Sequence, residues 1–314
     1  LDGQLDWSPR LAWDVSIAGT NINPAGQWPQ WPGRLKANLT STGQMQDGQL
    51  TAQVDITRVS GELRDQPVNL RSRLTWDKDQ LQVKQFDFES GTAKVSAQGR
   101  VGEQVKLDWS INAANLEELY PRAGGQLYAT GQISGTQTEP VIQTTFNGKA
   151  LSLPGYRVND IRGQLGLDLF RWQQVNINLT AEAIRVRDYQ VDSLQVSADP
   201  GQLQLEARAA KNTARVELRG EAGPDGWLGR IEKIDLQGPG FDSWHLQSPV
   251  ALNLVKHNLR LDRFCLQNQT ASLCGELQQT PESWHSQLEL INFPLQVFTP
   301  WLPAELIVDG VANG

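Results

Sequence analysis

The sequence predicts an all-β protein whose mostly antiparallel sheet is long, curls over itself and forms an elongated open groove with an apolar interior. Three observations predict this fold class. Apolar and polar residues alternate in many stretches, as in strands that have one apolar and one solvated face. Turn residues separate these stretches at short intervals. Helical periodicity is nearly absent, and the 11 Trp residues with a single Met suit sheets better than helical bundles.

The alternating stretches are the predicted strands. They imply roughly 20 strands, many of them about five to eight residues long. The clearest are residues 50–56, 81–83, 86–88, 175–179, 203–209, 214–218, 252–254, 259–261 and 287–290. The turns between them are predicted at residues 46–48, 77–79, 199–201, 223–226 and 238–240, where Gly, Pro and Asp gather.

Two short helical turns interrupt this pattern. They are expected at residues 116–120 and 295–298, and Pro121 and Pro300 end them. The Pro- and Trp-rich stretch at residues 24–33 is interpreted as a loop and not as a domain linker, because charge composition does not change across it.

Both helical turns lie within copies of an internal sequence repeat. Six positions of residues 116–135 match residues 295–314 at a constant offset (295 − 116 = 179), without a gap. A looser copy near the N-terminus matches at offsets of 94 (108 − 14) and 92 (125 − 33). Such repetition predicts one continuous repeat array over residues 1–314, with frames near 13–43, 107–135 and 286–314.

Composition excludes several classes of protein. Charged residues make up 20% of the 314 residues, and no apolar run is long enough for a membrane-spanning helix. The net charge of −7 has no basic patch to neutralise phosphates, so nucleic acid is not an expected partner. The chain lacks an initiator Met and ends within a repeat frame, so we expect a piece of a longer protein.

The two cysteines, Cys265 and Cys274, flank a predicted turn over residues 268–271. Such a turn places them opposite each other on antiparallel strands, at a spacing close to that of a disulfide. A hairpin disulfide implies an oxidising compartment, whereas two buried free thiols are the alternative.

Catalytic chemistry is not expected. The matching strings Asp242-Ser-Trp-His245 and Glu282-Ser-Trp-His285 contain the residue types of a triad, but no nucleophile elbow accompanies them. The carboxylates lie in the polar phase of the alternating strands, as solvated residues do. No phosphate-binding loop, dinucleotide motif or metal-ligand set occurs, so neither cofactor nor metal is expected.

A sheet face with this many apolar side chains must be shielded from water. Two sheets packed as a sandwich would shield it, but sandwich domains usually come as separate units with linkers, whereas this repeat has none. A continuous curled sheet would instead leave an apolar groove. Its candidate lining residues share the apolar phase of their strands, and each of them could also pack against a facing sheet: Val54, Ile56, Leu81, Val83, Ile177, Leu179, Val196, Leu205, Val216, Leu252, Leu261 and Leu288.

Motifs in a fixed order resemble the TamB family. They are Leu116-x-x-Leu119-Tyr-Pro, then Gly131-x-Ile-x-Gly135-Thr-x-x-x-Pro140, then Leu151-x-Leu-Pro-Gly-Tyr156. The stretches at 21–33 and 295–314 are similar to that family as well. Each motif is weak alone, but their order covers essentially the whole chain.

This resemblance implies a β-taco-like groove of the AsmA-like group in the periplasm of a Gram-negative bacterium. It implies an inner-membrane anchor and a contact with TamA, an outer-membrane barrel, both through segments outside these residues. Two functions follow as hypotheses. One is carriage of phospholipid acyl chains between the membranes. The other is a scaffold for assembling outer-membrane barrel proteins and autotransporters, with client strands added at sheet edges.

Overall fold

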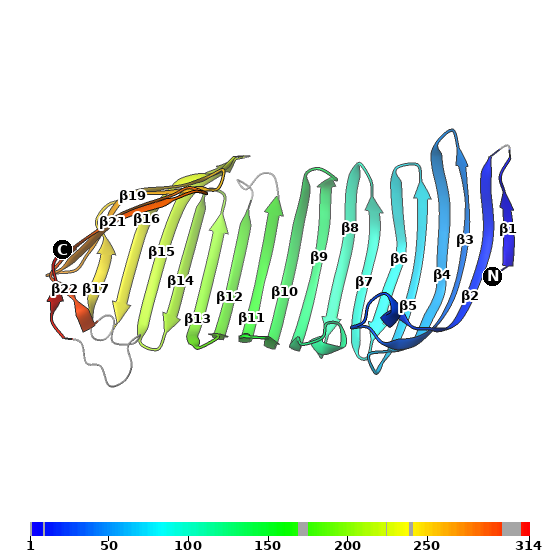
Figure 1. The fold of residues 1–314 in the computed structure, drawn as a ribbon, viewed down its shortest axis with the longest axis horizontal. Coiled ribbons are helices and arrows are strands. Elements are labelled where there is room, and N and C mark those ends of the chain that lie inside the picture. The colour runs from blue at the N-terminus through cyan, green and yellow to red at the C-terminus, as the bar shows by residue number, and fades with distance from the viewer. Residues whose placement is uncertain (1, 9, 169–174, 224, 239–240, 297–308) are drawn as a thin grey trace. The chain divides into compact units, whose positions relative to one another are not determined.

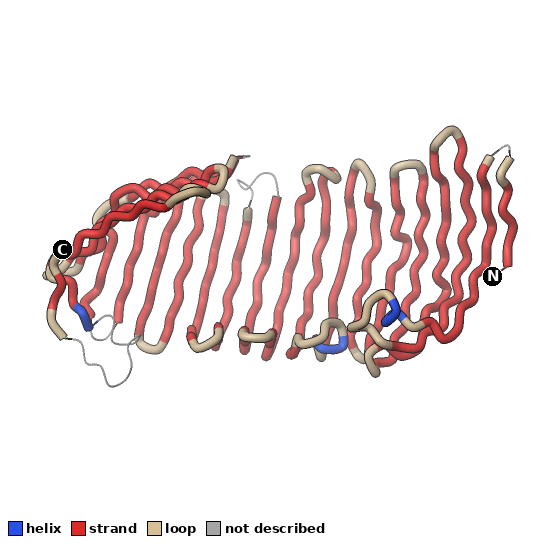
Figure 2. The backbone as a smooth tube through the Cα atoms, in the orientation of Figure 1, coloured by secondary structure: helices blue, strands red, loops and turns tan. Residues whose placement is uncertain are grey.

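The computed structural model describes residues 2–8, 10–168, 175–223, 225–238, 241–296 and 309–314. The chain divides into two compact units, unit 1 at Leu1–Arg162 and unit 2 at Gly163–Gly314. In the described residues helix is confined to short turns, and nearly everything else is strand (Figure 2). The predicted all-β, antiparallel fold class with one or two helical turns is confirmed.

Unit 1 is an antiparallel meander in which each strand pairs with the next along the chain (Figure 1). Two 3-10 turns interrupt it, η1 (Pro24–Gly26) and η2 (Leu116–Glu118). The strands are β1 (Asp2–Asp6), β2 (Leu11–Ile22), β3 (Gly33–Gln46), β4 (Gln49–Leu63), β5 (Gln66–Asp77), β6 (Gln80–Ser90), β7 (Ala93–Val101), β8 (Gln104–Ala113), β9 (Gly124–Thr136) and β10 (Pro140–Leu153), and β11 (Tyr156–Asp168) begins in this unit.

Unit 2 by itself is also an antiparallel meander, which then branches. One strand, β16, pairs through its first half with β18 and through its second half with β17. Beyond this branch, β18 to β21 turn away from the direction of β12 to β15 (Figure 1). The strands are β12 (Asn176–Val186), β13 (Tyr189–Asp199), β14 (Gln202–Ala209), β15 (Asn212–Gly223), β16 (Gly226–Gly238), β17 (Phe241–Leu246), β18 (Val250–Val255), β19 (Asn258–Gln267), β20 (Ser272–Gln279), β21 (Trp284–Ile291), β22 (Phe293–Pro294) and β23 (Val311–Ala312).

The strands are longer than predicted. Strand β4 has 15 residues and β6 has 11, whereas the sequence pattern indicated about five to eight. The prediction was wrong because β-bulges interrupt the alternation without ending the strand. In β4 the apolar residues change phase between Ile56 and Val59, where the register with β5 shifts. Residues 81–83 and 86–88, two separate predicted stretches, are joined by a similar shift inside β6.

Several predicted turns are confirmed. The connections β3–β4, β5–β6 and β13–β14 lie at residues 47–48, 78–79 and 200–201. Asp47 and Gly48 have φ values of 50° and 75°, the left-handed pair that matches the twist of a tight hairpin. The turns predicted around Pro224, Pro239 and Gly240 involve residues outside those described.

The first predicted helical turn is confirmed as the 3-10 turn η2. The Asn115 side chain accepts a hydrogen bond from the Glu117 N–H (3.2 Å) and so caps it. Asn23 caps η1 in the same way, by accepting from the Ala25 N–H (3.1 Å). In the second predicted turn, Leu295 and Gln296 have 3-10 geometry, while Phe298, Pro300 and Leu306 lie outside the described residues.

Cys265 and Cys274 are register partners on β19 and β20, and their sulfur atoms are bonded (S–S 2.08 Å). The turn between the strands lies over residues 268–271, where the Asn268 N–H donates to the Ala271 carbonyl (3.0 Å). The Asn268 side chain also accepts from the N–H groups of Thr270 and Ala271. The hairpin is therefore closed by local hydrogen bonds and by one covalent bond.

Replacing both cysteines with Ala is expected to lower the free energy of unfolding by about 2–3 kcal/mol, because the bond closes a short loop in the unfolded chain. Urea unfolding of the oxidised protein and of the double variant measures this. Reduction of the unaltered protein should reproduce the loss. Free thiols at both positions in protein from an oxidising compartment, detected by non-reducing peptide mass spectrometry, would contradict the pairing.

Candidate functional site: an apolar sheet face

Cross-strand register gathers the apolar side chains of unit 1 on one face of its sheet. Residues directly opposite each other on antiparallel strands project to the same side, so each register line forms a row. One row crosses nine strands and consists of Val15, Ser41, Val54, Leu74, Val83, Gly99, Leu107, Ile133 and Ile142. The next row consists of Ile17, Leu39, Ile56, Ser72, Phe86, Ala97, Trp109, Gly131 and Thr144.

Unit 2 has rows of the same kind. One row consists of Leu179, Val196, Leu205, Val216 and Ile234, from β12 to β16. A second consists of Ile177, Ala198, Leu203, Leu218, Ile231 and Val250. A third begins at Gly229 and continues through Leu252, Leu261 and Leu277. The side of each unit that carries these rows is its apolar face.

All twelve candidate lining residues lie on the apolar face of their own unit. Val54 and Val83 share one row of unit 1, and Ile56 and Leu81 lie in adjacent rows. In unit 2 the register joins Leu179, Val196, Leu205 and Val216 into one row, and Leu252 directly faces Leu261. Leu288 lies opposite Gly275 near the end of the unit and is 64% exposed.

The apolar face has little cover. Most of its side chains are half-buried, and no large side chain among those described is fully buried. A packed sandwich would bury its central Leu, Ile and Phe residues almost completely. Here the buried apolar positions are mostly Ala and Val. Among the described residues, most of the apolar face of each unit therefore has no sheet packed over it.

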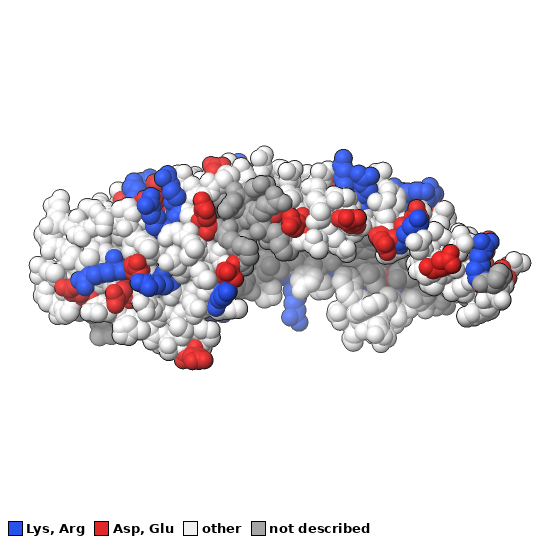
Figure 3. All heavy atoms as spheres, turned by 90° about the horizontal axis from the view of Figure 1, so that it is seen from above, with Lys and Arg blue, Asp and Glu red and all other residues white. Residues whose placement is uncertain are grey.

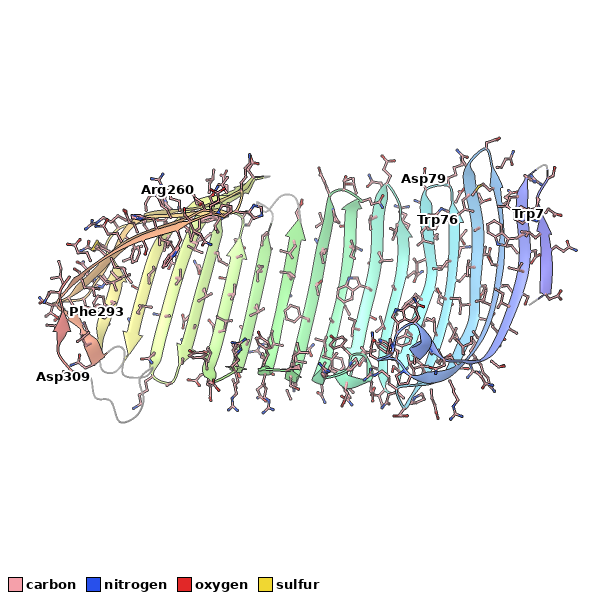
Figure 4. All side chains as sticks on the ribbon, viewed as in Figure 1. Trp7, Trp76, Asp79, Arg260, Phe293 and Asp309 are labelled. Atoms are coloured by element: carbon pink, nitrogen blue, oxygen red, sulfur yellow. A yellow bond between two sulfur atoms is a disulfide. The ribbon has the colours of Figure 1, made fainter. Side chains whose placement is uncertain are left out.

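One end of the unit 1 strands is covered. The segment at residues 114–123, which contains η2, is held against the β6–β7 turn, where the Glu118 carboxylate accepts from the N–H groups of Thr92 (2.7 Å) and Ala93 (2.9 Å). The Ser90 hydroxyl donates to the Glu118 carbonyl (2.7 Å), and Ser90 is buried. Arg64 donates to the Glu117 carbonyl and stacks over the Trp31 ring. Trp76 and Asp79 mark the other end of these strands (Figure 4).

A small cluster of buried hydrophobic residues packs together in the C-terminal part of unit 2. Trp244 (4% exposed) lies 5.5 Å from Phe293 between ring centroids, and both pack with Ala271. Phe293, the first residue of β22, is labelled in Figure 4. The similar string at 282–285 has a different environment, because Trp284 is 73% exposed. The two Ser-Trp-His strings are thus not equivalent sites, and only the first contributes to a core.

The face opposite the apolar rows carries ion pairs. On β14 and β15, register partners Glu206 and Arg215 are joined at 2.8 Å, and the Arg215 guanidinium lowers the pKa of the Glu206 carboxyl. On β16 the Asp235 carboxylate lies 2.8 Å from Lys233 and raises the pKa of that amine. Seen from above in Figure 3, Lys and Arg side chains lie near Asp and Glu side chains in several places.

A shallow hollow of about 280 Å³ lies over β12 to β15. Each of the four strands contributes three consecutive residues to its lining: one from the row that runs from Leu179 to Val216, and the polar residue before and after it in sequence. The apolar residues two positions before or after the row do not line the hollow. Because those polar neighbours project to the opposite face, the hollow opens on the ion-paired side. It therefore does not belong to the apolar face.

The described residues contain no cluster of three or more His, Cys, Asp or Glu side chains that could hold a metal ion. Within the same residues, no helix has the length and apolar character to cross a lipid bilayer.

Other residues of the apolar face were not among the candidates predicted from sequence. Phe86 and Phe88 face Ser72 and Leu70 across β5 and β6, and Trp109 faces Gly131. Phe86 and Phe88 lie in an alternating stretch, so the signal was present. Ser72 and Gly99 carry no such signal, because only the register places a small or polar residue within an apolar row.

The family described as "TamB, N-terminal domain" matches residues 1–314, the whole chain. The chain belongs to the TamB N-terminal domain family. The "Translocation and assembly module subunit TamB" of Haemophilus influenzae is 22% identical to it over 282 residues, which cover 87% of this chain. The chain spans about a fifth of that relative, since the match covers 22% of the relative's length. No solved structure matches the chain.

The Glu206–Arg215 pair gives a pH-dependent contribution to stability in this TamB-family chain. A carboxyl whose pKa is lowered on folding stabilises the fold above its unfolded pKa of about 4.3, and this is lost as pH falls through the folded pKa. We expect Glu206→Gln to unfold more easily than the unaltered chain at neutral pH and to lose this difference below pH 4.3.

Urea unfolding at several pH values measures this effect. Glu182→Gln is the matched control, because Glu182 is an exposed strand residue without an ion pair among the described residues. A difference between Glu206→Gln and the unaltered chain that persists unchanged in acid would contradict the ion-pair explanation.

Proposed function

We propose that this chain is a segment of a periplasmic conduit that carries phospholipid between the inner and outer membranes and so supports outer-membrane biogenesis. The observation that carries the proposal is the apolar face of each unit, where rows of half-exposed apolar side chains have no facing sheet among the described residues. In this proposal the phospholipid acyl chains supply the missing cover.

The energetics of such a face favour transfer over tight binding. Each methylene that leaves water for an apolar surface contributes about 0.8 kcal/mol, so an acyl chain is strongly favoured on the face. Neighbouring rows present similar Leu, Val, Ile and Ala side chains, so adjacent positions are similar in energy. None of the twelve candidate lining residues is charged, so none of them can hold a lipid headgroup in place through an ion pair.

Family membership supports a place in the translocation and assembly module, since the curated relative is named as a subunit of it. In this proposal the whole protein is tethered to the inner membrane and contacts TamA through segments outside these residues. The ion-paired face opposite the apolar rows suits contact with water. The disulfide between Cys265 and Cys274 suits an oxidising compartment such as the periplasm.

Photo-crosslinking in cells tests the proposal. Leu205 and Val196 are register partners on the apolar face, and their neighbours Gln204 and Gln195 project to the other side. A photoreactive residue should capture phospholipid at Leu205 and Val196 and little at Gln204 and Gln195. Equal capture at all four positions, or intramolecular links alone at Leu205 and Val196, would overturn the proposal.

A charge on the apolar face should interrupt transfer. With a photoreactive residue at Val216, which faces Leu205, we expect Leu205→Asp to reduce lipid capture at least about tenfold. A tenfold reduction corresponds to about 1.4 kcal/mol, and removing a carboxylate from water costs more free energy than this. Gln204→Asp introduces the same charge on the opposite face and should leave capture unchanged. Equal loss in both variants would indicate general damage to the fold and contradict the proposal.

The word assembly in the relative's name supports a second function, a scaffold that helps outer-membrane barrel proteins and autotransporters to insert together with TamA. A client strand would add to an exposed sheet edge through main-chain hydrogen bonds. The same crosslinking separates the two functions. Capture of unfolded barrel segments in place of phospholipid supports the scaffold.

A further inference from the structure

Three indole rings of the apolar face lie over glycines. Trp13 on β2 faces Gly43 on β3, and Trp109 on β8 faces Gly131 on β9. In unit 2 the Trp227 ring lies against two glycines that face each other, one from β15 and one from β16. The glycines of that pair are Gly220 and Gly229.

The rings lie close to the sheet. A Cβ atom added to Gly43 would lie 2.3 Å from Cζ2 of Trp13, and one added to Gly131 would lie 2.6 Å from Cζ2 of Trp109. The corresponding distance from Gly220 to Cζ2 of Trp227 is 2.5 Å. Each ring therefore lies as close to the sheet as a Cβ atom of the opposing residue would lie. The indoles form part of the floor of the apolar face and do not rise above it.

The φ angles do not require glycine at these positions. Gly43, Gly131, Gly220 and Gly229 all lie outside the left-handed φ range that favours glycine, unlike Gly99 with a φ of 146°. At Gly43 the reason for glycine is therefore space for the ring, whereas at the other three glycines a backbone oxygen lies about as close to the added Cβ as the ring does. An aromatic ring that covers a glycine across a strand pair is a known way to stabilise such a sheet position.

The Trp13 ring is also fixed by a polar contact. Its Nε1–H donates to the Ser41 hydroxyl at 2.9 Å, so the only polar atom of the indole is satisfied within the floor. Its sideways movement is limited, because Leu11 and Val15 flank it on its own strand and Leu5 faces it from β1. A ring displaced from Gly43 must therefore rise into the space over the apolar face.

We propose that these glycines are positioning residues that hold the indoles flat and keep the space over the apolar face open to acyl chains. The inference rests on the proposed lipid function. It extends that function by naming residues that limit how far the indole rings project from the sheet.

Gly43 offers the clearest test. The three atoms nearest to its added Cβ all belong to the Trp13 ring, whereas the carbonyl oxygen of Gln143 lies 2.5 Å from a Cβ added at Gly131. Gly43→Ala therefore acts on the indole, and Trp13→Val combined with Gly43→Ala removes the clash. Gly166→Ala is the matched control, because the nearest atom to its added Cβ is 3.6 Å away.

The experiment uses the full-length protein and two readouts. With a photoreactive residue at Val54, which lies beside the Gly43 partner Ala52, Gly43→Ala should reduce phospholipid capture several-fold. The double variant should restore it, and Gly166→Ala should leave it unchanged. In protein labelled with 5-fluorotryptophan, the ¹⁹F resonance of Trp13, assigned by Trp13→Phe, should move toward its solvent-exposed position in Gly43→Ala.

The outcomes separate the two proposals. Unchanged capture at Val54 in Gly43→Ala, or a loss that the double variant does not reverse, would overturn the role of Gly43 in keeping the face open. An unmoved Trp13 resonance would overturn the positioning itself. Absence of phospholipid capture in the unaltered protein would overturn the lipid function, while the ¹⁹F result would still decide whether Gly43 positions the indole.

Discussion

Cross-strand register is the constraint on which the rest of this structure depends. Alternation places apolar side chains on one side of each strand, and antiparallel pairing then joins them into rows that cross a whole unit. A slip of one residue in any pair would turn a strand's apolar side chains toward water. The bulges inside β4 and β6 act against such a slip, since each one restores the apolar phase after an extra residue.

This arrangement leaves a single layer with two unlike faces. One face carries ion pairs such as Glu206–Arg215 and Lys233–Asp235, which keep it compatible with water. The other carries the apolar rows, and its side chains remain half-buried because nothing among the described residues packs over most of it. A large apolar surface on a protein usually marks a place where another molecule binds. The proposed lipid function rests on this asymmetry, and membership of the TamB family supports a role in the translocation and assembly module.

Cover is present only where specific contacts hold it. In unit 1 the Glu118 carboxylate, with Ser90 and Arg64, fixes one connecting segment at the strand ends. In unit 2 the Trp244–Phe293 cluster joins β17 to the short pair β22 and β23. The indoles over glycines have the opposite effect, because they add apolar surface without adding height. The extent of open face is thus set by a small number of contacts and not by average composition.

Local features of the chain were predictable from the sequence. These features depend on residues at most nine positions apart: the alternation near Leu203, the hairpin turn at Asp47-Gly48, the capped turn at Leu116 and the opposed cysteines. Twelve candidate residues could be assigned to an apolar phase for the same reason. The apolar phase of each candidate is a property of its own strand. The resemblance to the TamB family supported the expectation that these strands together form a groove.

Only the tertiary structure decided which residues face each other. Strand length, the bulges, the burial of Trp244 but not Trp284, and the contact of Trp13 with Gly43 all depend on partners far along the chain. A glycine opposite a tryptophan leaves no local pattern, because the space it provides belongs to another strand. The open apolar face was equally a tertiary result. Alternation predicts an apolar side for each strand, but whether a second layer covers that side depends on how distant strands pack.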